Sequence, residues 1–536
     1  MPQLGSTGSR VAPPVTRRSL LLVTATALGG VALAACGAGA PAATTSSAAS
    51  SAPPSAAVAS TSSAATSSAV SSSAVSSSAA ASSIASSAPS STSAASSTTA
   101  SSSAAPSSSA ASAAASLPKA AAGSLLLLLE ADDNQKKVWQ QVVDAFHQAG
   151  HKPQVELSNP SDIYTKFDTM LAGNAGPDLF AGFETKQLPH YVGVDAALNM
   201  DPYMSRSSTI KPDAFFKFTW SKHVLNGHLS AMPTNNAPLG IFYNEDMFRE
   251  AGVTAPPAQW GAKGWDYAAF LDAAHKLTKT SGAAKAWFSS WSTWWLYCYP
   301  FVWGNGGHLF NSDVTQVLVD SPEVISTYQW LADLTWKEHV QPTPDEVKAN
   351  KPDFIAGTLA ISGCTENCAP PYLQKITSFK WNAAAVPSGT SGVWTRDPSN
   401  SAIAWKGTKQ PDATWELAEF MGGDVGQLII GLGGNGVPSR VSAAKSDKFL
   451  HQPNGVNWQV FVDAIDHEGI QPVTDIFPKM DDLISKQTAP LWANQASAQQ
   501  VMTTLKPLLE ELLKSAKFRR DRGQLWQQHG WAAATS

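Results

Sequence analysis

The sequence predicts an α/β protein of two lobes, each built on a mostly parallel sheet flanked by helices, with a hinge between them. Three observations lead to this prediction. Strand-like and helix-like segments alternate over residues 125–181, which is typical of a parallel sheet covered by helices. The part of the chain after Pro118 has about 415 residues, enough for two separate cores. A proline-bounded stretch at 232–252 follows, and we interpret it as a crossing between the lobes.

The alternation begins with five consecutive leucines, Leu125 to Leu129. So short and wholly apolar a run is typical of a strand buried on both faces. A helix to about Gly150 comes next, then a strand at 155–157, a helix at 163–171 and a strand at 177–181. Ligands of such sheets bind beyond the carboxyl ends of the strands. The candidate binding loops are therefore 130–134, 158–162 and 182–187.

The crossing combines three local signals. Residues 233–236 read Pro-Thr-Asn-Asn and predict a polar turn, and residues 239–243 predict a strand. Residues 244–246, Asn-Glu-Asp, can cap a short helix over 247–251, which Gly252 would end. Further along, residues 265–280 predict an amphipathic helix. Residues 322–337 predict another helix. Proline is favoured in the first turn of a helix, and Ser321 or Asp320 can serve as its N-cap.

The first 118 residues are not expected to belong to the folded part. A twin-arginine pair, Arg17-Arg18, precedes a short apolar run that ends in Leu-Ala-Ala-Cys at Cys36, which resembles a bacterial lipobox. We expect residues 1–36 to be an export signal and Cys36 to be lipidated; a plain signal peptide or a membrane helix is the alternative. The run is shorter than the ~20 residues that a span needs. Residues 37–118 are nearly all Ala and Ser, and predict a disordered tether.

The motifs of the folded part resemble, in order and spacing, the extracellular solute-binding proteins of bacterial ABC importers, especially the sugar-binding group. Residues 239–252 resemble that family's L-x-Y-N-x-D-L-F-x-x-A-G, and residues 164–180 resemble the segment that contains its G-x-A-P-D-I-F. Residues 317–323 resemble V-x-L-D-S-P-E, and residues 412–421 resemble N-P-E-A-A-W-E-F-L-K-F. The resemblance extends over roughly residues 125 to 515.

The resemblance implies a type II periplasmic-binding-protein fold. Its N-terminal lobe would comprise 119–235 and 404–450, and its C-terminal lobe 236–403 and 451–536. It also implies that a monomer on the outer face of the cell membrane captures a carbohydrate, a mono- or oligosaccharide, by hinge closure and delivers it to a permease. A polyol, a glycerol phosphodiester or a polyamine is the alternative ligand. Arg396 and Arg440 are the candidates to hold a phosphate.

Tryptophans are the main candidate ligand contacts. All 19 follow the tether, and they are densest between Trp287 and Trp303. Aromatic faces cover the C–H faces of sugars, while carboxylates and amides bind the hydroxyls. Filling the core of the second lobe is the alternative role. We expect Trp291, Trp294 and Trp295 to contact the ligand, and in the family the position near Trp294 does so.

Polar candidates accompany the tryptophans. Each has an ordinary structural alternative, as a helix cap, a turn former or a solvated loop residue. After 361–363 the family usually places a Trp, which is absent here, and Glu366 is a candidate replacement. The full set of polar and loop candidates is Asp132, Glu184, Asn235, Asn236, Glu366 and Trp394.

Other classes of function find less support. The net charge of −4 and the lack of a basic patch speak against nucleic acid. Residues 431–436 satisfy G-x-G-x-x-G, but a helical pattern precedes them and Val-Pro follows, so they predict a turn rather than a dinucleotide site. Cys364 and Cys368 suit a local disulfide better than a metal, and we expect Cys298, which is then left over, to be buried. The sequence contains no nucleophile or zinc signature, so we expect a binding protein without cofactor or metal. Two rival functions are a glycosidase that uses a carboxylate pair such as Glu184 and Glu366, and a surface adhesin.

Overall fold

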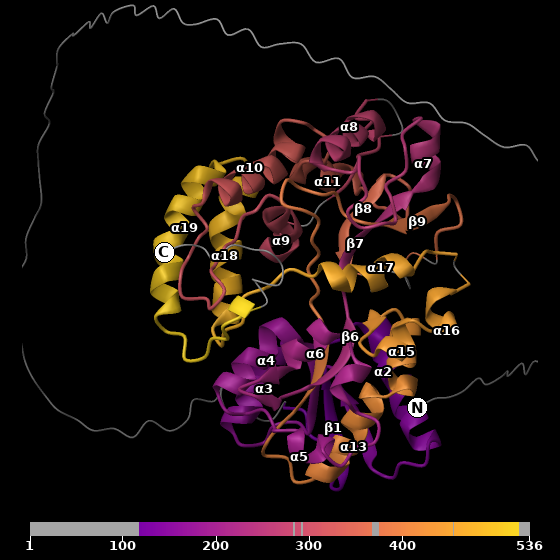
Figure 1. Cartoon of the computed structure of the whole chain (residues 1–536), viewed down its shortest axis with the longest axis vertical. Coiled ribbons are helices and arrows are strands. Elements are labelled where there is room, and N and C mark those ends of the chain that lie inside the picture. The colour runs from indigo at the N-terminus through magenta and orange to yellow at the C-terminus, as the bar shows by residue number, and fades with distance from the viewer. Residues whose placement is uncertain are drawn as a thin grey trace, which may run out of the picture. The chain divides into compact units, whose positions relative to one another are not determined.

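The computed structural model describes residues 117–281, 285–290, 293–366, 373, 375–453 and 455–524, with the backbone alone at 183–185 and 363–366. All of these belong to one compact unit, Ala100–Ser536. Its strands form a six-stranded sheet, a three-stranded sheet and a two-stranded hairpin, and each of the two larger sheets has its own group of helices (Figure 1).

The six-stranded sheet has the order β11-β6-β10-β3-β1-β2. Strand β1 pairs in parallel with both β2 and β3, and β10 then pairs antiparallel with β3 and with β6. Strand β11 adds antiparallel to β6 at the edge. The strands are β1 Ser124–Leu129, β2 Gln154–Ser158, β3 Leu179–Phe183, β6 Met232–Asn236, β10 Asn400–Ala404 and β11 Val437–Pro438.

The leucine run of β1 is buried on both faces, as its composition predicts. Leu125, Leu127 and Leu129 belong to one hydrophobic cluster, and Leu128 belongs to another on the opposite face. The helices and hairpin of this part are α2 Asp133–Gln148, α3 Ile163–Ala172, α4 Glu184–Gly193, α5 Asp201–Met204, η1 Pro212–Ala214, α6 Lys217–His223, β4 Val224–Leu225, β5 His228–Leu229, α13 Pro411–Gly422, α14 Asp424–Leu432, α15 Val441–Ala444 and α16 Asp447–Leu450.

The three-stranded sheet has β7 at its centre, paired antiparallel with β8 and with β9. Its strands are β7 Leu239–Asn244, β8 Ile361–Glu366 and β9 Trp381–Ala384. The helices of this part are α7 Glu245–Glu250, α8 Tyr267–Leu277, α9 Trp295–Gly304, α10 Pro322–Trp336, α11 Pro344–Asn350, α17 Gln459–Ala464, η2 Ile465–His467, α18 Phe477–Trp492 and α19 Ala498–Leu513.

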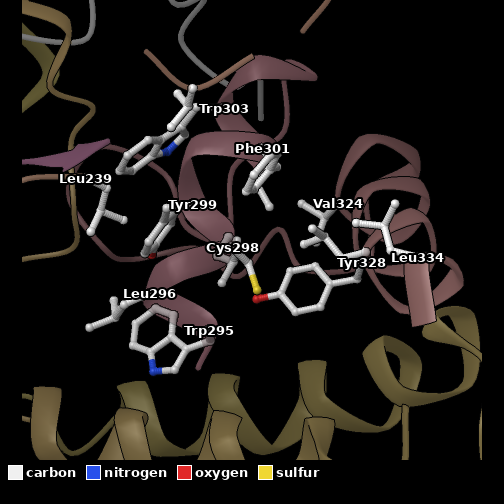
Figure 2. Close-up of a cluster of buried hydrophobic side chains, with 14 of the residues drawn as sticks. Leu239, Trp295, Leu296, Cys298, Tyr299, Phe301, Trp303, Val324, Tyr328 and Leu334 are labelled. Carbon is white, nitrogen blue, oxygen red and sulfur yellow. The ribbon is translucent and has the colours of Figure 1, made fainter. Parts of the chain in front are cut away.

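Helix α9, in which every residue except Tyr297 is buried, organises the largest hydrophobic cluster. Tyr299 stacks on Trp303 with ring centroids 4.5 Å apart, and Cys298 lies beside Tyr328 of α10 (Figure 2). Burial raises the pKa of the Cys298 thiol to about 12, so it stays protonated and behaves as a small apolar residue. The prediction that Cys298 is buried is therefore confirmed.

The α/β class is confirmed, but the sheets are more mixed than predicted. Only two of the five pairings in the larger sheet are parallel, and both pairings in the smaller sheet are antiparallel. The reason lies in β10, which returns from the part of the chain that carries the smaller sheet and inserts between β3 and β6. Such an insertion has no helical crossover to impose a parallel direction.

The predicted polar turn at 233–236 is wrong, because these residues belong to strand β6 and are all buried. Tertiary partners bind some of their polar groups, although the side-chain Nδ2 of Asn235 is buried without a hydrogen-bond partner among the described residues. The Thr219 hydroxyl donates to Asn236 Oδ1 at 2.7 Å, and Gln427 Nε2 donates to the Pro233 carbonyl at 3.0 Å. Pairing on both sides by β10 and β11 thus outweighs the local turn preference of Pro and Asn.

The predicted turn in the glycine-rich segment forms over residues 433–436, whereas Gly431 and Leu432 are the last residues of α14. This turn follows α14 and leads directly into β11, and a Cβ on Gly436 would lie 2.4 Å from the Asn236 carbonyl oxygen. Among the described residues, no helix is long and apolar enough to cross a membrane. The same part of the chain contains no group of three or more His, Cys, Asp or Glu placed to hold a metal ion.

Candidate functional site

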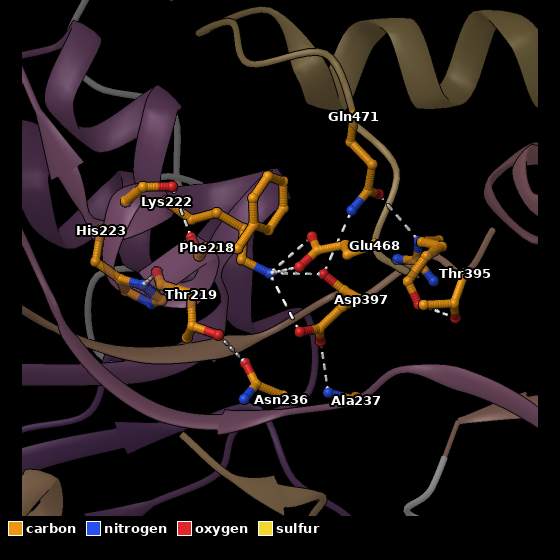
Figure 3. Close-up of polar contacts among 12 residues, drawn as sticks. Phe218, Thr219, Lys222, His223, Asn236, Ala237, Thr395, Asp397, Glu468 and Gln471 are labelled. Atoms are coloured by element: carbon orange, nitrogen blue, oxygen red, sulfur yellow. Dashed lines mark hydrogen bonds and ion pairs between the residues drawn. The ribbon is translucent and has the colours of Figure 1, made fainter. Parts of the chain in front are cut away.

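A buried charged cluster lies where the chain passes between the two larger sheets (Figure 3). Lys222 Nζ of α6 donates to both carboxylate oxygens of Glu468, at 2.9 and 3.1 Å, and to the backbone carbonyl of Asp397 at 3.0 Å. Asp397 Oδ1 accepts from the backbone N–H of Ala237 at 2.6 Å. The three charged side chains are at most 2 % exposed. One ammonium thus joins the β9–β10 connection to the segment before α18, and Asp397 joins both to the β6–β7 connection.

Backbone hydrogen bonds align the same segments. The N–H of Leu239 donates to the Arg396 carbonyl at 3.0 Å, and Thr395 exchanges hydrogen bonds with the segment 467–469. Burial raises the pKa of the Glu468 carboxyl, the Lys222 charge opposes this, and the Asp397 charge adds to it. Since nothing in this cluster is open to solvent, we assign it to holding the junction rather than to binding.

A second polar cluster begins at the carboxyl ends of β1 and β3. Glu130 directly follows β1, Tyr164 lies in the first turn of α3, and Lys186 lies in the first turn of α4. Burial raises the pKa of the Tyr164 hydroxyl, and the neighbouring Glu130 carboxylate adds to the shift. The Lys186 ammonium lies 5.1 Å from the centre of the Tyr164 ring. Two of the three predicted binding loops, 130–134 and 182–187, therefore bring side chains together.

Helix α18 supplies the partner of Lys186. Asp481 Oδ2 lies 3.3 Å from Lys186 Nζ, and Asp481 Oδ1 accepts the indole N–H of Trp294 at 2.6 Å and of Trp295 at 2.8 Å. One carboxylate thus orients two adjacent indoles while pairing with a lysine from the other sheet's helices. The Lys186 and Asp481 side chains are 27 % and 11 % exposed, so solvent reaches this pair.

Arg396 connects the two clusters. Its guanidinium lies 4.9 Å from the centre of the Trp294 ring and 5.6 Å from that of Tyr297, and its Nε donates to Gln471 Oε1 at 3.0 Å. Arg396 is fully buried, whereas Trp294 and Tyr297 are partly exposed. Because the cation lies against them, the two aromatic rings are held rigidly in place.

This second cluster combines partly exposed rings with a lysine and two carboxylates from both sheets' surroundings. Rings of fixed orientation can cover the C–H face of a ring-shaped ligand, and the charged groups can hydrogen-bond to its rim. We name it the aromatic–acid cluster: Glu130, Tyr164, Lys186, Trp294, Tyr297, Arg396 and Asp481.

Residues 132–428 match the model of the family described as bacterial extracellular solute-binding protein. This match spans more than half of the chain. The chain belongs to that family. For this solute-binding protein, the family that the sequence motifs indicate is thereby confirmed.

Relatives and solved structures agree with this assignment. A binding protein of Brucella abortus is 23 % identical over 268 residues, which are 48 % of this chain and 61 % of the relative, so the match falls short of two thirds of that protein. The sn-glycerol-3-phosphate-binding periplasmic protein of Agrobacterium fabrum is 29 % identical over 186 residues, 30 % of this chain and 39 % of that one.

Among solved structures, an ABC substrate-binding protein of Listeria monocytogenes in complex with cycloalternan is similar with a TM-score of 0.65 and 19 % identity, over 73 % of this chain and 98 % of that one. The GacH receptor of Streptomyces glaucescens gives 0.63 and 19 %, over 74 % and 100 %. UgpB of Mycobacterium tuberculosis in complex with glycerophosphocholine gives 0.63 and 15 %, over 74 % and 99 %. These similarities establish the two-lobed fold class that the sequence predicts.

The predicted aromatic contacts of this solute-binding protein have different surroundings. Trp294 lies in the aromatic–acid cluster. Trp295 is 1 % exposed and packs in the core beside Tyr299 and Phe477. Trp394 is partly exposed, and its N–H donates to the Ser391 carbonyl at 3.3 Å. Trp291 lies outside the described residues.

The predicted polar contacts lie mostly in structural positions. Asp132 caps α2 in a reciprocal capping box with Gln135. Asn235 and Asn236 are buried in β6, at 1 % and 0 % exposed. Glu184 begins α4, and Glu366 ends β8 opposite Leu239, but their side chains lie outside the described part. Cys36, Cys368 and the side chain of Cys364 also lie outside it, so the lipid and disulfide predictions remain predictions.

Sequence reasoning did not single out Lys186, Tyr164 or Asp481. Lys186 lies within a loop that the strand pattern flagged, and Tyr164 begins a motif shared with the family. Asp481 carried a weaker signal, because it interrupts the buried face that Phe477, Met480 and Ile484 form on α18. An acid on an apolar stripe needs a buried partner, but the sequence alone does not name it.

Proposed function

We propose that this solute-binding protein is the receptor of an ABC importer and captures a carbohydrate between its two lobes. The observation that carries the proposal is the aromatic–acid cluster, in which Asp481 holds the Trp294 indole and pairs with Lys186 from the helices of the other sheet. The family assignment supports the receptor role. The sugar-bound or inhibitor-bound relatives support the ligand class by analogy only.

Charge favours a neutral ligand. Lys186 is paired with Asp481, and Arg396 is fully buried between Gln471 and two aromatic rings. Neither cation is therefore available without loss of an existing contact. A glycerol phosphodiester is the second candidate, because two cations lie in the cluster and one solved relative holds glycerophosphocholine. A polyol is a further candidate, because it would use the same contacts as a sugar.

Closure of the lobes follows from where the contacts lie. We place the N-terminal lobe at 119–235 and 404–450 and the C-terminal lobe at 236–403 and 451–536. The buried cluster around Lys222 would stay intact as the hinge. The exposed pair of Lys186 and Asp481 would open and close with the ligand.

A binding screen tests the ligand class. Mono- and oligosaccharides, polyols, polyamines and glycerol phosphodiesters would be screened by thermal shift, followed by calorimetry on the hits. A ligand at a hundred times its dissociation constant stabilises a protein by ~2.7 kcal/mol. We expect a saccharide to bind and Trp294→Ala to weaken it at least ~30-fold, as for an anchoring aromatic worth ~2 kcal/mol.

Trp381→Ala is the matched control, because this tryptophan is also partly exposed but packs on Phe242 of the smaller sheet. It should leave the affinity unchanged. Binding of a phosphodiester but of no saccharide would favour the second candidate. Hydrolysis of the bound sugar, followed by chromatography, would overturn the assignment as a receptor without catalysis.

We also propose that the protein is held at the outer face of the membrane by a lipid on Cys36, with 37–118 as the tether. Radioactive palmitate fed to producing cells should label the protein. Cys36→Ser should abolish the label and move the protein to the soluble fraction. Unchanged labelling of the variant would refute the anchor.

A further inference from the structure

A hollow of about 500 Å³ adjoins the aromatic–acid cluster and has no role in the site as described so far. Trp294 forms one wall and Trp492 another. The remaining lining residues include Thr293, Pro344, Ser485 and Ala489. Its volume lies within the range of small-molecule sites, ~300–1,000 Å³.

Helix α18 leads from the cluster into this hollow. Asp481, Ser485, Ala489 and Trp492 follow each other at intervals of four, four and three residues, which places them along one face of the helix. From Asp481 to Trp492 the helix rises about 16 Å at 1.5 Å per residue. Ser485 and Ala489, in the middle of this face, are exposed. One continuous surface therefore extends from the acid that holds Trp294 to a second tryptophan.

The two indoles offer the hollow carbon surface rather than hydrogen-bond donors. The N–H of Trp294 is taken by Asp481. The N–H of Trp492 is buried, without a hydrogen-bond partner in the described residues, while the residue itself remains partly exposed. Trp492 is held in place, since its carbonyl accepts the Trp336 N–H at 3.1 Å and its ring packs 5.8 Å from that of Tyr328.

The chemistry of the lining selects an occupant. None of the described residues that line the hollow is charged, which disfavours a phosphate or a polyamine. Two aromatic walls with the hydroxyls of Thr293 and Ser485 suit a neutral molecule that alternates C–H faces with hydroxyl groups.

We propose that this hollow is an extension of the ligand site that holds the further rings of an oligosaccharide, with Trp492 as its outer platform. The inference rests on the proposed carbohydrate function and adds to it that the ligand is longer than one ring. Trp492 and the α18 face then determine chain-length preference, whereas Trp294 determines binding as such.

The test is a comparison of affinities along one series, from mono- to tetrasaccharide, of the sugar that the screen identifies. Calorimetry on the purified protein would compare the wild type with Trp492→Ala and Ala489→Trp. Trp492→Ala removes the platform, and Ala489→Trp fills the hollow. Each should lower the affinity for the longest saccharide by about fivefold or more, as for an aromatic contact of ~1 kcal/mol. Affinity for the monosaccharide should not change.

Lys486→Trp is the control for Ala489→Trp, because Lys486 is exposed on α18 but does not line the hollow. Equal effects of Trp492→Ala on short and long ligands, or no effect on either, would overturn the extension and leave the carbohydrate site standing. Failure of the wild type to bind any saccharide would overturn the carbohydrate function itself, and the extension with it.

Discussion

Two lysines of this solute-binding protein pair with acids that come from distant parts of the chain, and their surroundings differ. Lys222 and Glu468 are at most 2 % exposed, and the same lysine also binds Asp397. Lys186 and Asp481 are 27 % and 11 % exposed. Solvent can stabilise a partly exposed ammonium such as that of Lys186 when its partner is lost, but it does not reach Lys222. Under the proposed function, the Lys222 pair is therefore a permanent joint and the Lys186 pair a reversible contact.

The largest expected effect is on the buried pair. Lys222→Met leaves Glu468 and Asp397 buried without their counter-charge, so the free energy of unfolding should fall by about 3–5 kcal/mol. Denaturant unfolding followed by tryptophan fluorescence measures it. The double variant Lys222→Met with Glu468→Gln should recover part of the loss. A single-variant loss no larger than that of Lys186→Met would contradict the assignment of the buried pair as the joint.

The next effect is the acid sensitivity of the same region. Burial lowers the pKa of His223, adjacent to Lys222, from 6.5 to about 3. The unfolded chain therefore binds a proton that the folded chain does not, and stability is complete above pH 6.5 and falls as the pH decreases towards 3. The contribution lost at pH 5 is about 2 kcal/mol.

His223→Asn keeps an amide donor for the Thr219 carbonyl, which His223 Nδ1 contacts at 2.8 Å, but does not titrate. The difference in the free energy of unfolding between pH 7 and pH 5 should therefore be smaller for this variant than for the wild type. An unchanged difference between the two pH values would refute the role of His223. His190 on α4, the helix of Lys186, has the opposite sign, since Asp168 raises its pKa and its contribution is lost as the pH rises.

The smallest effect on stability belongs to the partly exposed pair. Lys186→Met should lower the free energy of unfolding by less than Lys222→Met does, because solvent reaches Lys186 and Asp481 keeps the indole N–H groups of Trp294 and Trp295 as partners. It should still weaken ligand binding by about twofold to fivefold, since in the proposed closure this pair joins the two lobes. Lys479→Met, an exposed lysine on the same helix as Asp481, is the control and should affect neither quantity. If Lys186→Met lowered the free energy of unfolding as much as Lys222→Met, the two pairs would not differ in their contribution to stability, and the prediction would be wrong.

Local sequence signals were sufficient where the cause of structure is local. The run Leu125 to Leu129 and the helix that follows it form as predicted, and of the predicted cap candidates Asn244 and Ser321 are the ones that cap. Each depends on neighbours within one or two turns of the chain, so periodicity and capping contain the needed information. The turn at 433–436 belongs to the same group, although the predicted segment began two residues earlier, within α14.

The sequence by itself therefore determined the α/β class, the family, most elements and the loops that carry Glu130 and Lys186. Only the tertiary structure decided that 233–236 is a strand, that β10 enters the first sheet antiparallel, and that Trp294 and Trp295 share the carboxylate of Asp481. The acid and the indoles are separated by more than 180 residues of chain. Contacts over such distances depend on how whole elements pack, and packing also decides which tryptophan fills the core and which remains exposed.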